Sequence, residues 1–281
     1  MVKSTALQVW PIPAFSDNYI WCIHDGHSAL IVDPGDAAPV IHYLQENQLQ
    51  LTGILITHYH ADHIGGIAAL LSATANGRTL PVYGPIAEAI AGRTHALIQG
   101  DEVDIATPAI HFQVLEVPGH TLGHIAYFAA AKGDEEQTDN KSSAEEPPRL
   151  FCGDTLFASG CGRLFEGTPT QMHASLAKFA ALPSNTLVYC THEYTLSNIR
   201  FALAVEPNNA DLIAWAKRAE ALREGNLPTL PTTIGKEIKT NPFMRCDQAD
   251  VIAAACEVAK RPTLESSAAV LAAIRAWKDR F

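Results

Sequence analysis

Long apolar runs are missing from this sequence, and none approaches the roughly 20 residues that a membrane-spanning helix needs. The first residues, Met1–Gln8, contain one lysine and have no apolar stretch behind them, so they do not match the pattern of a secretory signal. We therefore expect a protein that neither spans a membrane nor is exported.

Paired cysteine motifs are also missing. The six cysteines lie at positions 22, 152, 161, 190, 246 and 256, with no C-x-x-C motif and no regular spacing. A disulfide framework would be unusual in a chain of 281 residues without an export signal. We expect reduced thiols that pack as small apolar side chains, in a cytoplasmic protein.

An excess of positive charge is absent as well. The chain has 20 Lys and Arg against 30 Asp and Glu, which gives a formal net charge of −10. That balance, and the lack of any stretch rich in Lys or Arg, argue against a nucleic acid or an anionic membrane as partner. Local basic sites for a small anion remain compatible with it.

Strand patterns alternate with turns and helical patterns through the first two thirds of the chain, which favours sheet layers covered by helices. The predicted strands are Asn18–Ile23, Ala29–Asp33, Gly53–Thr57, Pro81–Tyr83, Ile110–Val117, Ile125–Ala129, Leu150–Cys152 and Leu187–Cys190. The predicted helices are Ala38–Gln45, Gly65–Ser72, Ile86–Ala91 and Pro169–Ala181.

The pattern changes after Thr195, where strand signals almost vanish. Pro228–Phe243, rich in Pro and Thr, predicts a long ordered loop, and Lys132–Arg149, with almost nothing apolar, predicts a solvated excursion. We expect a first domain over residues 1–194 and a smaller, all-helical domain over 195–281. Its predicted helices are Leu196–Val205, Asp211–Glu224, Gln248–Ala259 and Ser266–Phe281.

Four residues of metal-binding types follow the apolar strand Gly53–Thr57, in the run His58-Tyr59-His60-Ala61-Asp62-His63. In extended chain His58 and His60 point to the same side and can bind one metal together. Asp62 and His63 fall at the turn into the next predicted helix and point elsewhere. Because adjacent side chains diverge, two ions side by side fit this spacing better than one. A polar loop with incidental histidines is the weaker alternative.

Three further residues of these types also follow predicted strands. His120 comes after a Pro-Gly turn that ends one strand, Asp154 follows Leu150–Cys152 and a glycine, and His192 follows Leu187–Cys190. Each residue taken alone could be an ordinary surface or core side chain. Three strand ends that present ligand types beside a four-residue cluster instead predict one metal centre.

The motifs T-H-Y-H-A-D-H at 57–63, P-G-H-T at 118–121, G-D at 153–154 and the later histidine resemble the metallo-β-lactamase superfamily. The resemblance implies an α/β protein with an αββα sandwich and a dinuclear metal site at one edge. It assigns one metal to His58, His60 and His120, the other to Asp62, His63 and His192, and a bridging role to Asp154. Such ligands suit zinc, our first expectation for the two divalent ions, and also iron or manganese.

Three more stretches, at 161–168, 191–195 and 240–245, look like the glyoxalase II family, hydroxyacylglutathione hydrolase, and the likeness covers nearly the whole chain. It implies that Arg163, Tyr194 and Arg245 line a glutathione site, and a planar Arg fork suits the carboxylates of glutathione. A lone Arg could equally be a solvated surface charge. Phe165 stands where some members have Tyr. Residues 246–248 lack an additional basic residue that some members have. The phenylalanine at 165 and this missing charge both lower the expected affinity for glutathione.

The resemblance implies hydrolysis of the thioester of S-(2-hydroxyacyl)glutathione, chiefly S-(R)-lactoylglutathione, to glutathione and D-lactate, a step of methylglyoxal detoxification. Hydroxide bridging the two ions would attack the carbonyl, with Asp62 and Asp154 as the catalytic carboxylates of the centre. Thr155 and Ser159 have no His or Asp at a recognisable triad spacing, so no protein nucleophile is expected. We expect a monomer whose partner is this small molecule.

Several other functions share such motifs. A mononuclear-iron glutathione persulfide dioxygenase would need one metal with open positions, and another metallo-β-lactamase-fold hydrolase would keep the centre and change the substrate. A non-catalytic metal-binding or nucleic-acid-processing member is the alternative of a different class. Seven candidate ligands and the helical C-terminal part favour the dinuclear hydrolase. Metal content would separate it from the dioxygenase, since about two ions per chain support the hydrolase and one iron supports the dioxygenase.

Overall fold

The computed structural model describes residues 7–74, 77, 79–131 and 146–281. The excursion expected at 132–149 lies, up to residue 145, outside the described residues, as do the first six residues of the N-terminal segment. Within the described ranges, no helix has both the length and the apolar character needed to cross a membrane.

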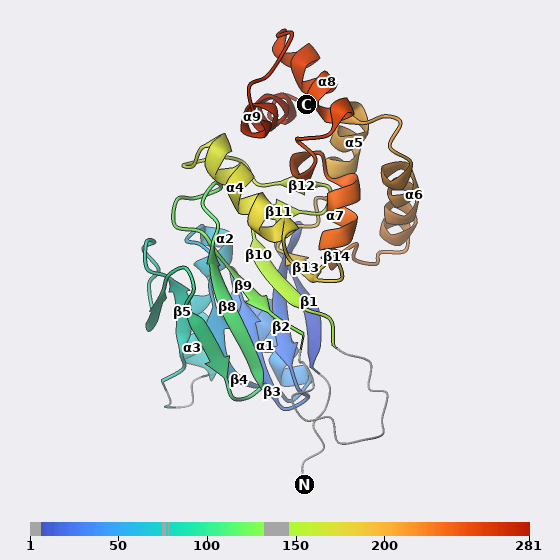
Figure 1. The fold of residues 1–281 in the computed structure, drawn as a ribbon. Coiled ribbons are helices and arrows are strands. Elements are labelled where there is room, and N and C mark those ends of the chain that lie inside the picture. The colour runs from blue at the N-terminus through green and yellow to red at the C-terminus, as the bar shows by residue number, and fades with distance from the viewer. Residues whose placement is uncertain (1–6, 75–76, 78, 132–145) are drawn as a thin grey trace, which may run out of the picture.

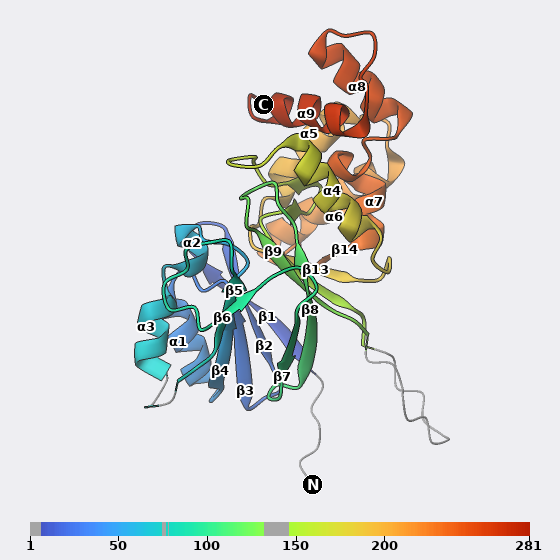
Figure 2. The same ribbon diagram turned by 60° about the vertical axis from the view of Figure 1, so that its left-hand side comes forward.

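Two six-stranded sheets lie face to face and form one half of the molecule (Figure 2). The first has the strand order β1(Gln8–Ala14), β2(Asn18–His24), β3(Ser28–Val32), β4(Gln50–Leu55), β5(Val82–Pro85), β6(His95–Leu97). The second has the order β14(Thr232–Thr233), β13(Leu187–Cys190), β10(Arg149–Gly153), β9(Ile125–Ala129), β8(Ile110–Glu116), β7(Glu102–Ile105). Strands β3 to β6 pair in parallel, as do β10 and β13, and the other pairs in these two sheets are antiparallel.

The main apolar core lies between the two sheets. Trp21 and Leu30 of the first sheet and Phe112, Tyr127 and Phe151 of the second belong to one cluster of buried side chains. All seven residues of β2 are buried, because the second sheet covers one face of this strand and helices cover the other. This packing holds the ends of the inner strands at fixed positions.

Helices cover the outer faces of both sheets. On the first sheet lie α1 (Ala37–Glu46) and α3 (Ile67–Thr74). On the second, at the end next to the C-terminal helices, lies α4 (Pro169–Ala180) (Figure 2). The α4 helix begins with a capping box in which the Thr168 and Gln171 side chains bond each other's backbone N–H groups. The predicted αββα sandwich is confirmed.

The C-terminal part gathers at one end of the sandwich (Figure 1) and is almost entirely helical, with only the two-residue strand β14 among its described residues. The predicted smaller helical domain is therefore confirmed as a feature of the fold. Its elements are α5(Thr195–Val205), α6(Ala210–Glu224), α7(Ile234–Thr240), the 3₁₀ turn η1(Pro242–Met244), α8(Ala249–Ala259) and α9(Ser267–Lys278).

Two of the predicted elements are wrong. Within Pro228–Phe243 the chain forms β14, α7 and η1 instead of a loop, because Thr233 acts as an N-cap that accepts a hydrogen bond from the Lys236 N–H. Ile86–Ala91 is not helical. There the Arg93 guanidinium donates hydrogen bonds to the carbonyls of Pro85 and Glu88, which holds the segment in turns.

Candidate metal centre and substrate cleft

The seven predicted metal ligands meet at the edge of the sandwich next to the helical domain. His58 and His60 follow β4, and Asp62 and His63 lie on α2 (Ala61–Ile64), a one-turn helix and not the turn that the sequence suggested. The other three ligands, His120, Asp154 and His192, follow strands β8, β10 and β13 of the second sheet.

His58, His60 and His120 form the first group. The Nδ1 atom of His60 lies 3.0 Å from Nε2 of His58 and 3.0 Å from Nε2 of His120. Three imidazole nitrogens that converge in this way cannot all satisfy one another with the few protons that they carry. Their convergence suits a cation that accepts a lone pair from each ring.

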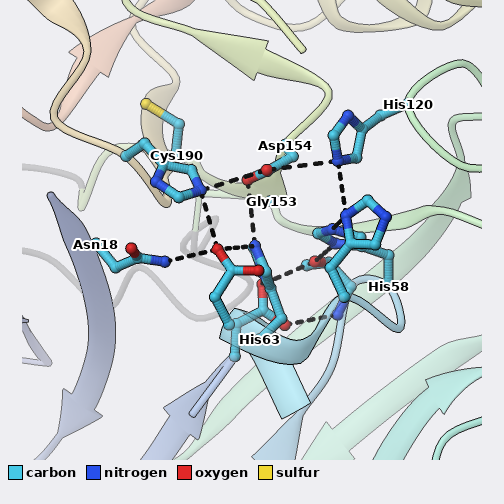
Figure 3. A network of polar contacts seen from close by, with 12 residues as sticks. Asn18, His58, His63, His120, Gly153, Asp154 and Cys190 are labelled. Atoms are coloured by element: carbon cyan, nitrogen blue, oxygen red, sulfur yellow. Dashed lines mark hydrogen bonds and ion pairs between the residues drawn. The ribbon is translucent and has the colours of Figure 1, made fainter. Parts of the chain in front are cut away.

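Asp62, His63 and His192 form the second group, in which Nε2 of His63 lies 3.8 Å and Nε2 of His192 3.5 Å from Oδ2 of Asp62. Asp154 lies between the two groups (Figure 3). Its Oδ1 is 3.4 Å from Nε2 of His63, and its Oδ2 is 3.3 Å from Nε2 of His192 and 3.5 Å from Nε2 of His120. One carboxylate thus reaches both groups.

These separations fit metal ligation. Ligand atoms about 2.0–2.1 Å from one ion at tetrahedral angles lie about 3.3 Å apart, close to the distances found here. Nε2 of His63 and Oδ1 of Asp154 are buried and have no hydrogen-bond partner among the described residues. Buried polar atoms are rarely left in this state without a bound ion or water. The fold and this set of donors imply divalent metal ions.

A second layer of contacts orients the histidines. Asp33 lies 3.0 Å from Nδ1 of His63 and accepts hydrogen bonds from the Thr57 backbone and hydroxyl at 2.8 and 2.7 Å. Asp17 lies 2.8 Å from Nδ1 of His192, and the Arg163 carbonyl lies 2.8 Å from Nδ1 of His120. Such partners fix the ring that turns its other nitrogen toward a metal.

A tight turn brings Asp154 to the centre. Gly153 has a φ of +48°, and a Cβ atom at this position would lie 2.3 Å from the Thr57 hydroxyl and 2.8 Å from Nε2 of His124. His124 is fully buried, stacks on His58 at 4.5 Å between ring centroids, and accepts a hydrogen bond from the Asp154 N–H at 3.2 Å. Only glycine allows β10 to turn this close to the β4 loop.

Burial and the charges of neighbouring side chains together set the protonation of this centre. Burial lowers the pKa of His58 well below the usual value, and the neighbouring rings of His63 and His124 lower it further, so His58 is a neutral ring with a free lone pair. Burial alone would raise the pKa of Asp154, but His63 and His192 hold that pKa well below its ordinary value. Burial alone would also lower the pKa values of His63 and His192, but neighbouring carboxylates, Asp154 first among them, outweigh it and raise both above the usual value. Metals bind neutral imidazole and ionised carboxylate, so His58 and Asp154 are already in the binding form, whereas His63 and His192 release a proton when an ion binds.

The centre opens into a cleft of about 850 Å³ between the sandwich and the helical domain. Tyr194 lines it and stacks on His192 with 4.6 Å between ring centroids, and burial raises the pKa of its phenol to about 12. At neutral pH the Tyr194 hydroxyl is therefore a hydrogen-bond donor. Four cationic side chains line the same cleft, namely Arg163, Arg200, Arg275 and Lys278.

Comparisons with known proteins agree with this architecture. A family described as the metallo-beta-lactamase superfamily matches residues 15–133, and one described as the hydroxyacylglutathione hydrolase C-terminus matches residues 193–281. A hydroxyacylglutathione hydrolase from Cupriavidus taiwanensis is 56% identical over 278 residues, which cover 98% of this chain and 99% of the relative. The chain belongs to the hydroxyacylglutathione hydrolase family. The resemblance found in the sequence motifs is confirmed.

Solved structures share the fold of this chain. ETHE1 from Myxococcus xanthus is similar at a TM-score of 0.60 and 25% identity, with 98% of each chain covered. TTHA1623, solved in a di-iron-bound form, is similar at a TM-score of 0.55 and 25% identity, covering 84% of this chain and all of that one. The αββα sandwich is thus shared by proteins with different names, and the helical domain carries the family's own match.

Arg245, which the resemblance placed in a glutathione site, does not line the cleft. Its guanidinium donates to both carboxylate oxygens of Glu206 at 2.9–3.1 Å and to the Ile238 carbonyl at 3.1 Å. Glu206 is only 2% exposed and follows the last residue of α5. The Arg245 guanidinium is therefore already paired with Glu206 and the Ile238 carbonyl inside the helical domain.

Sequence reasoning missed three of the four cations. Arg200 belongs to α5, and Arg275 and Lys278 belong to α9, where each reads as one polar residue of an amphipathic helix. The run of Arg275 and Lys278 at a spacing of three residues puts both on the same face of α9. That spacing was the available signal, but the sequence alone does not say that this face borders the metal centre.

Proposed function

We propose that this chain hydrolyses the thioester of S-(2-hydroxyacyl)glutathione, chiefly S-(R)-lactoylglutathione, to glutathione and D-lactate, and so contributes to methylglyoxal detoxification. Water adds its oxygen to the acyl carbon, the carbon–sulfur bond breaks, and the proton goes to the thiolate. The observation that carries the proposal is one cleft that holds both a candidate metal centre and four cationic side chains. The full-length likeness to hydroxyacylglutathione hydrolases supports it.

The substrate's charges suit the helical end of the cleft. Glutathione has two carboxylates, and Arg200, Arg275 and Lys278 present positive charge from α5 and α9. Arg163 is 64% exposed and lies 3.7 Å from Asp279, which leaves most of its fork free for a ligand. We propose that these cations hold the glutathione carboxylates while the thioester lies at the metal centre beside Tyr194.

We propose two divalent ions, with zinc first and iron or manganese as alternatives. One would be held by His58, His60 and His120, the other by Asp62, His63 and His192, with Asp154 shared. When bound, the ions supply Lewis acidity, which lowers the pKa of water and polarises a carbonyl oxygen. The chain's own part is to hold these seven side chains, through Asp33 and Asp17 among others, and to line the site with Tyr194 as a donor.

The division of the chain is part of the same proposal. Residues 1–194 supply the seven candidate ligands, and residues 195–281 supply three of the four cations of the cleft. We propose a catalytic domain followed by a helical substrate-binding domain. Because one chain supplies both sets of residues, a monomer suffices. The six cysteines are all free, which is compatible with the reducing cytoplasm that the sequence led us to expect.

The test is steady-state hydrolysis of S-(R)-lactoylglutathione by metal-loaded protein, with the lactoyl thioester of a small uncharged thiol and a β-lactam as controls. We expect clear preference for the glutathione thioester and about two ions per chain by metal analysis. Equal rates on both thioesters would refute the glutathione site. A single iron per chain would instead favour the mononuclear dioxygenase.

A further inference from the structure

The side-chain amide of Asn198 connects two walls of the substrate cleft. Asn198 lies on α5, is 2% exposed, and borders the cleft. Its Nδ2 donates to the Ala158 carbonyl at 3.0 Å, and its Oδ1 accepts from Nζ of Lys278 at 2.6 Å. Ala158 belongs to the hairpin β11(Leu156–Phe157)–β12(Gly160–Cys161), which begins two residues after Asp154.

The orientation of this amide is fixed by its partners. A carbonyl faces one end and an ammonium faces the other, so the reversed amide would put its NH₂ group against Nζ of Lys278. The hairpin also packs directly on Asn198, since a Cβ at Gly160 would lie 2.6 Å from both Cγ and Nδ2 of the amide. Asn241 donates to the carbonyls of Phe157 and Gly160 at 3.2 and 2.9 Å and so also holds the hairpin in place.

Lys278 needs a fixed acceptor more than an ordinary surface lysine does. Burial, together with the positive charges of Arg275 on the same helix and Arg200 on α5, lowers the pKa of its ammonium to about 8, while Cys161 on β12 and Asp279 act in the opposite direction. An ammonium so placed is both desolvated and repelled by its neighbours. The Asn198 carbonyl oxygen stabilises the charged form and sets where that charge lies.

We propose that Asn198 is a positioning residue for substrate recognition. Its amide holds the Lys278 ammonium at a fixed place in the cleft relative to the hairpin that follows Asp154, where the ammonium binds a carboxylate of the substrate. The proposal rests on the proposed glutathione function. It assigns to Asn198 an effect on substrate binding that acts through Lys278, with no contact between Asn198 and the reacting atoms.

The test uses the full-length, metal-loaded chain with Asn198→Leu and Asn198→Asp. Asn198→Leu should raise KM for S-(R)-lactoylglutathione about tenfold, the size expected for a hydrogen bond to a charged group, and leave kcat and the uncharged thioester nearly unchanged. The fall of kcat/KM on the alkaline side should move to lower pH in Asn198→Leu and to higher pH in Asn198→Asp. A carboxylate stabilises the ammonium, whereas a leucine leaves it without its acceptor.

Two controls separate this role from general support of the fold. In a Lys278→Met background, Asn198→Leu should add no further increase in KM, because the group that it positions is gone. Asn209→Ala removes a comparable amide, which caps α6 and donates to the Lys239 carbonyl, and should leave KM and the pH profile unchanged. Melting temperatures and metal content establish that each variant is folded and loaded.

The outcomes are distinct. Three results would each overturn the positioning role. The first is an equal loss of kcat/KM on both thioesters in Asn198→Leu. The second is a further increase in KM when Asn198→Leu is added to Lys278→Met, and the third is an alkaline fall of kcat/KM at the same pH as in the wild type in both Asn198 variants. If the Leu variant fails to fold, Asn198→Asp decides the question, because its fall of kcat/KM on the alkaline side should move to higher pH. A wild-type chain without preference for the glutathione thioester would refute the proposed function itself, whatever the Asn198 variants do.

Discussion

Arg245 offers the sharpest contrast between what its motif suggests and where it lies. The motif suggests a glutathione ligand, whereas the structure joins its guanidinium to Glu206 through three hydrogen bonds of 2.9–3.1 Å. Arg245→Met would leave the Glu206 carboxylate, only 2% exposed, without its countercharge. We therefore expect a large loss of stability and an unchanged KM.

The size of the loss follows from burial. Removing one partner of a buried ion pair costs about 3–5 kcal/mol, because the remaining charge stays desolvated. For a domain of this size each 1 kcal/mol lowers the melting temperature by about 2–4 °C, so Arg245→Met should melt roughly 6–20 °C below the wild type. The double variant Glu206→Gln/Arg245→Met should recover part of this loss, since a neutral amide is cheaper to bury than a carboxylate.

Thermal unfolding and steady-state kinetics at a temperature below the transition measure the two effects on the same preparations. The matched variant is Lys278→Met, which removes a cation that does line the cleft and should raise KM for the glutathione thioester at least tenfold. A tenfold higher KM for Arg245→Met on the glutathione thioester alone, with an unchanged melting temperature, would refute our reading of Arg245 and restore the role that its motif suggests.

Three further predictions concern the centre, the cleft and the fold. Asp154→Ala should lose metal from both ligand groups and abolish hydrolysis; two tightly bound ions in that variant, by metal analysis, would show that Asp154 does not bridge. Lys278 is charged below a pKa of about 8 and neutral above it, so kcat/KM for the anionic substrate should fall as pH rises through 8. That fall should be absent in Lys278→Arg, and its persistence there would assign it to another group. Thr168→Ala removes the capping box of α4 and should cost about 1 kcal/mol in urea unfolding without changing kcat.

The candidate ligands could be predicted because each follows a strand, and a strand's period and turn residues are local signals. His58 to His63, His120, Asp154 and His192 all lie one to six residues beyond strands that the sequence pattern located. Asp17 and Asp33 could not be found in this way. They contact His192 and His63 across 175 and 30 positions of the chain, and only the closed sandwich brings them together.

The sequence also missed β1 (Gln8–Ala14), whose two prolines argue against a strand although it lies at a sheet edge, where proline is tolerated. The other missed elements are short. The β6 and β7 strands span three and four residues at the edges of their sheets, too few for a periodic pattern, and the hairpin β11–β12 has two residues in each strand. The turn around Glu88 depends on Arg93, and the start of α7 depends on one threonine cap. Packing against distant residues decides such short segments, and local propensity does not.

The seven candidate ligands are divided between the two sheets of the sandwich. Four follow β4 of the first sheet, and three follow β8, β10 and β13 of the second. Occupancy of the centre is therefore thermodynamically linked to keeping the sheets together, since the unfolded chain cannot offer both halves at once. A hundredfold excess of free metal over its dissociation constant adds about 2.7 kcal/mol to the free energy of unfolding. A chelator that stops catalysis would then also act as a denaturant, and the melting temperature of this protein would report the free metal concentration around it.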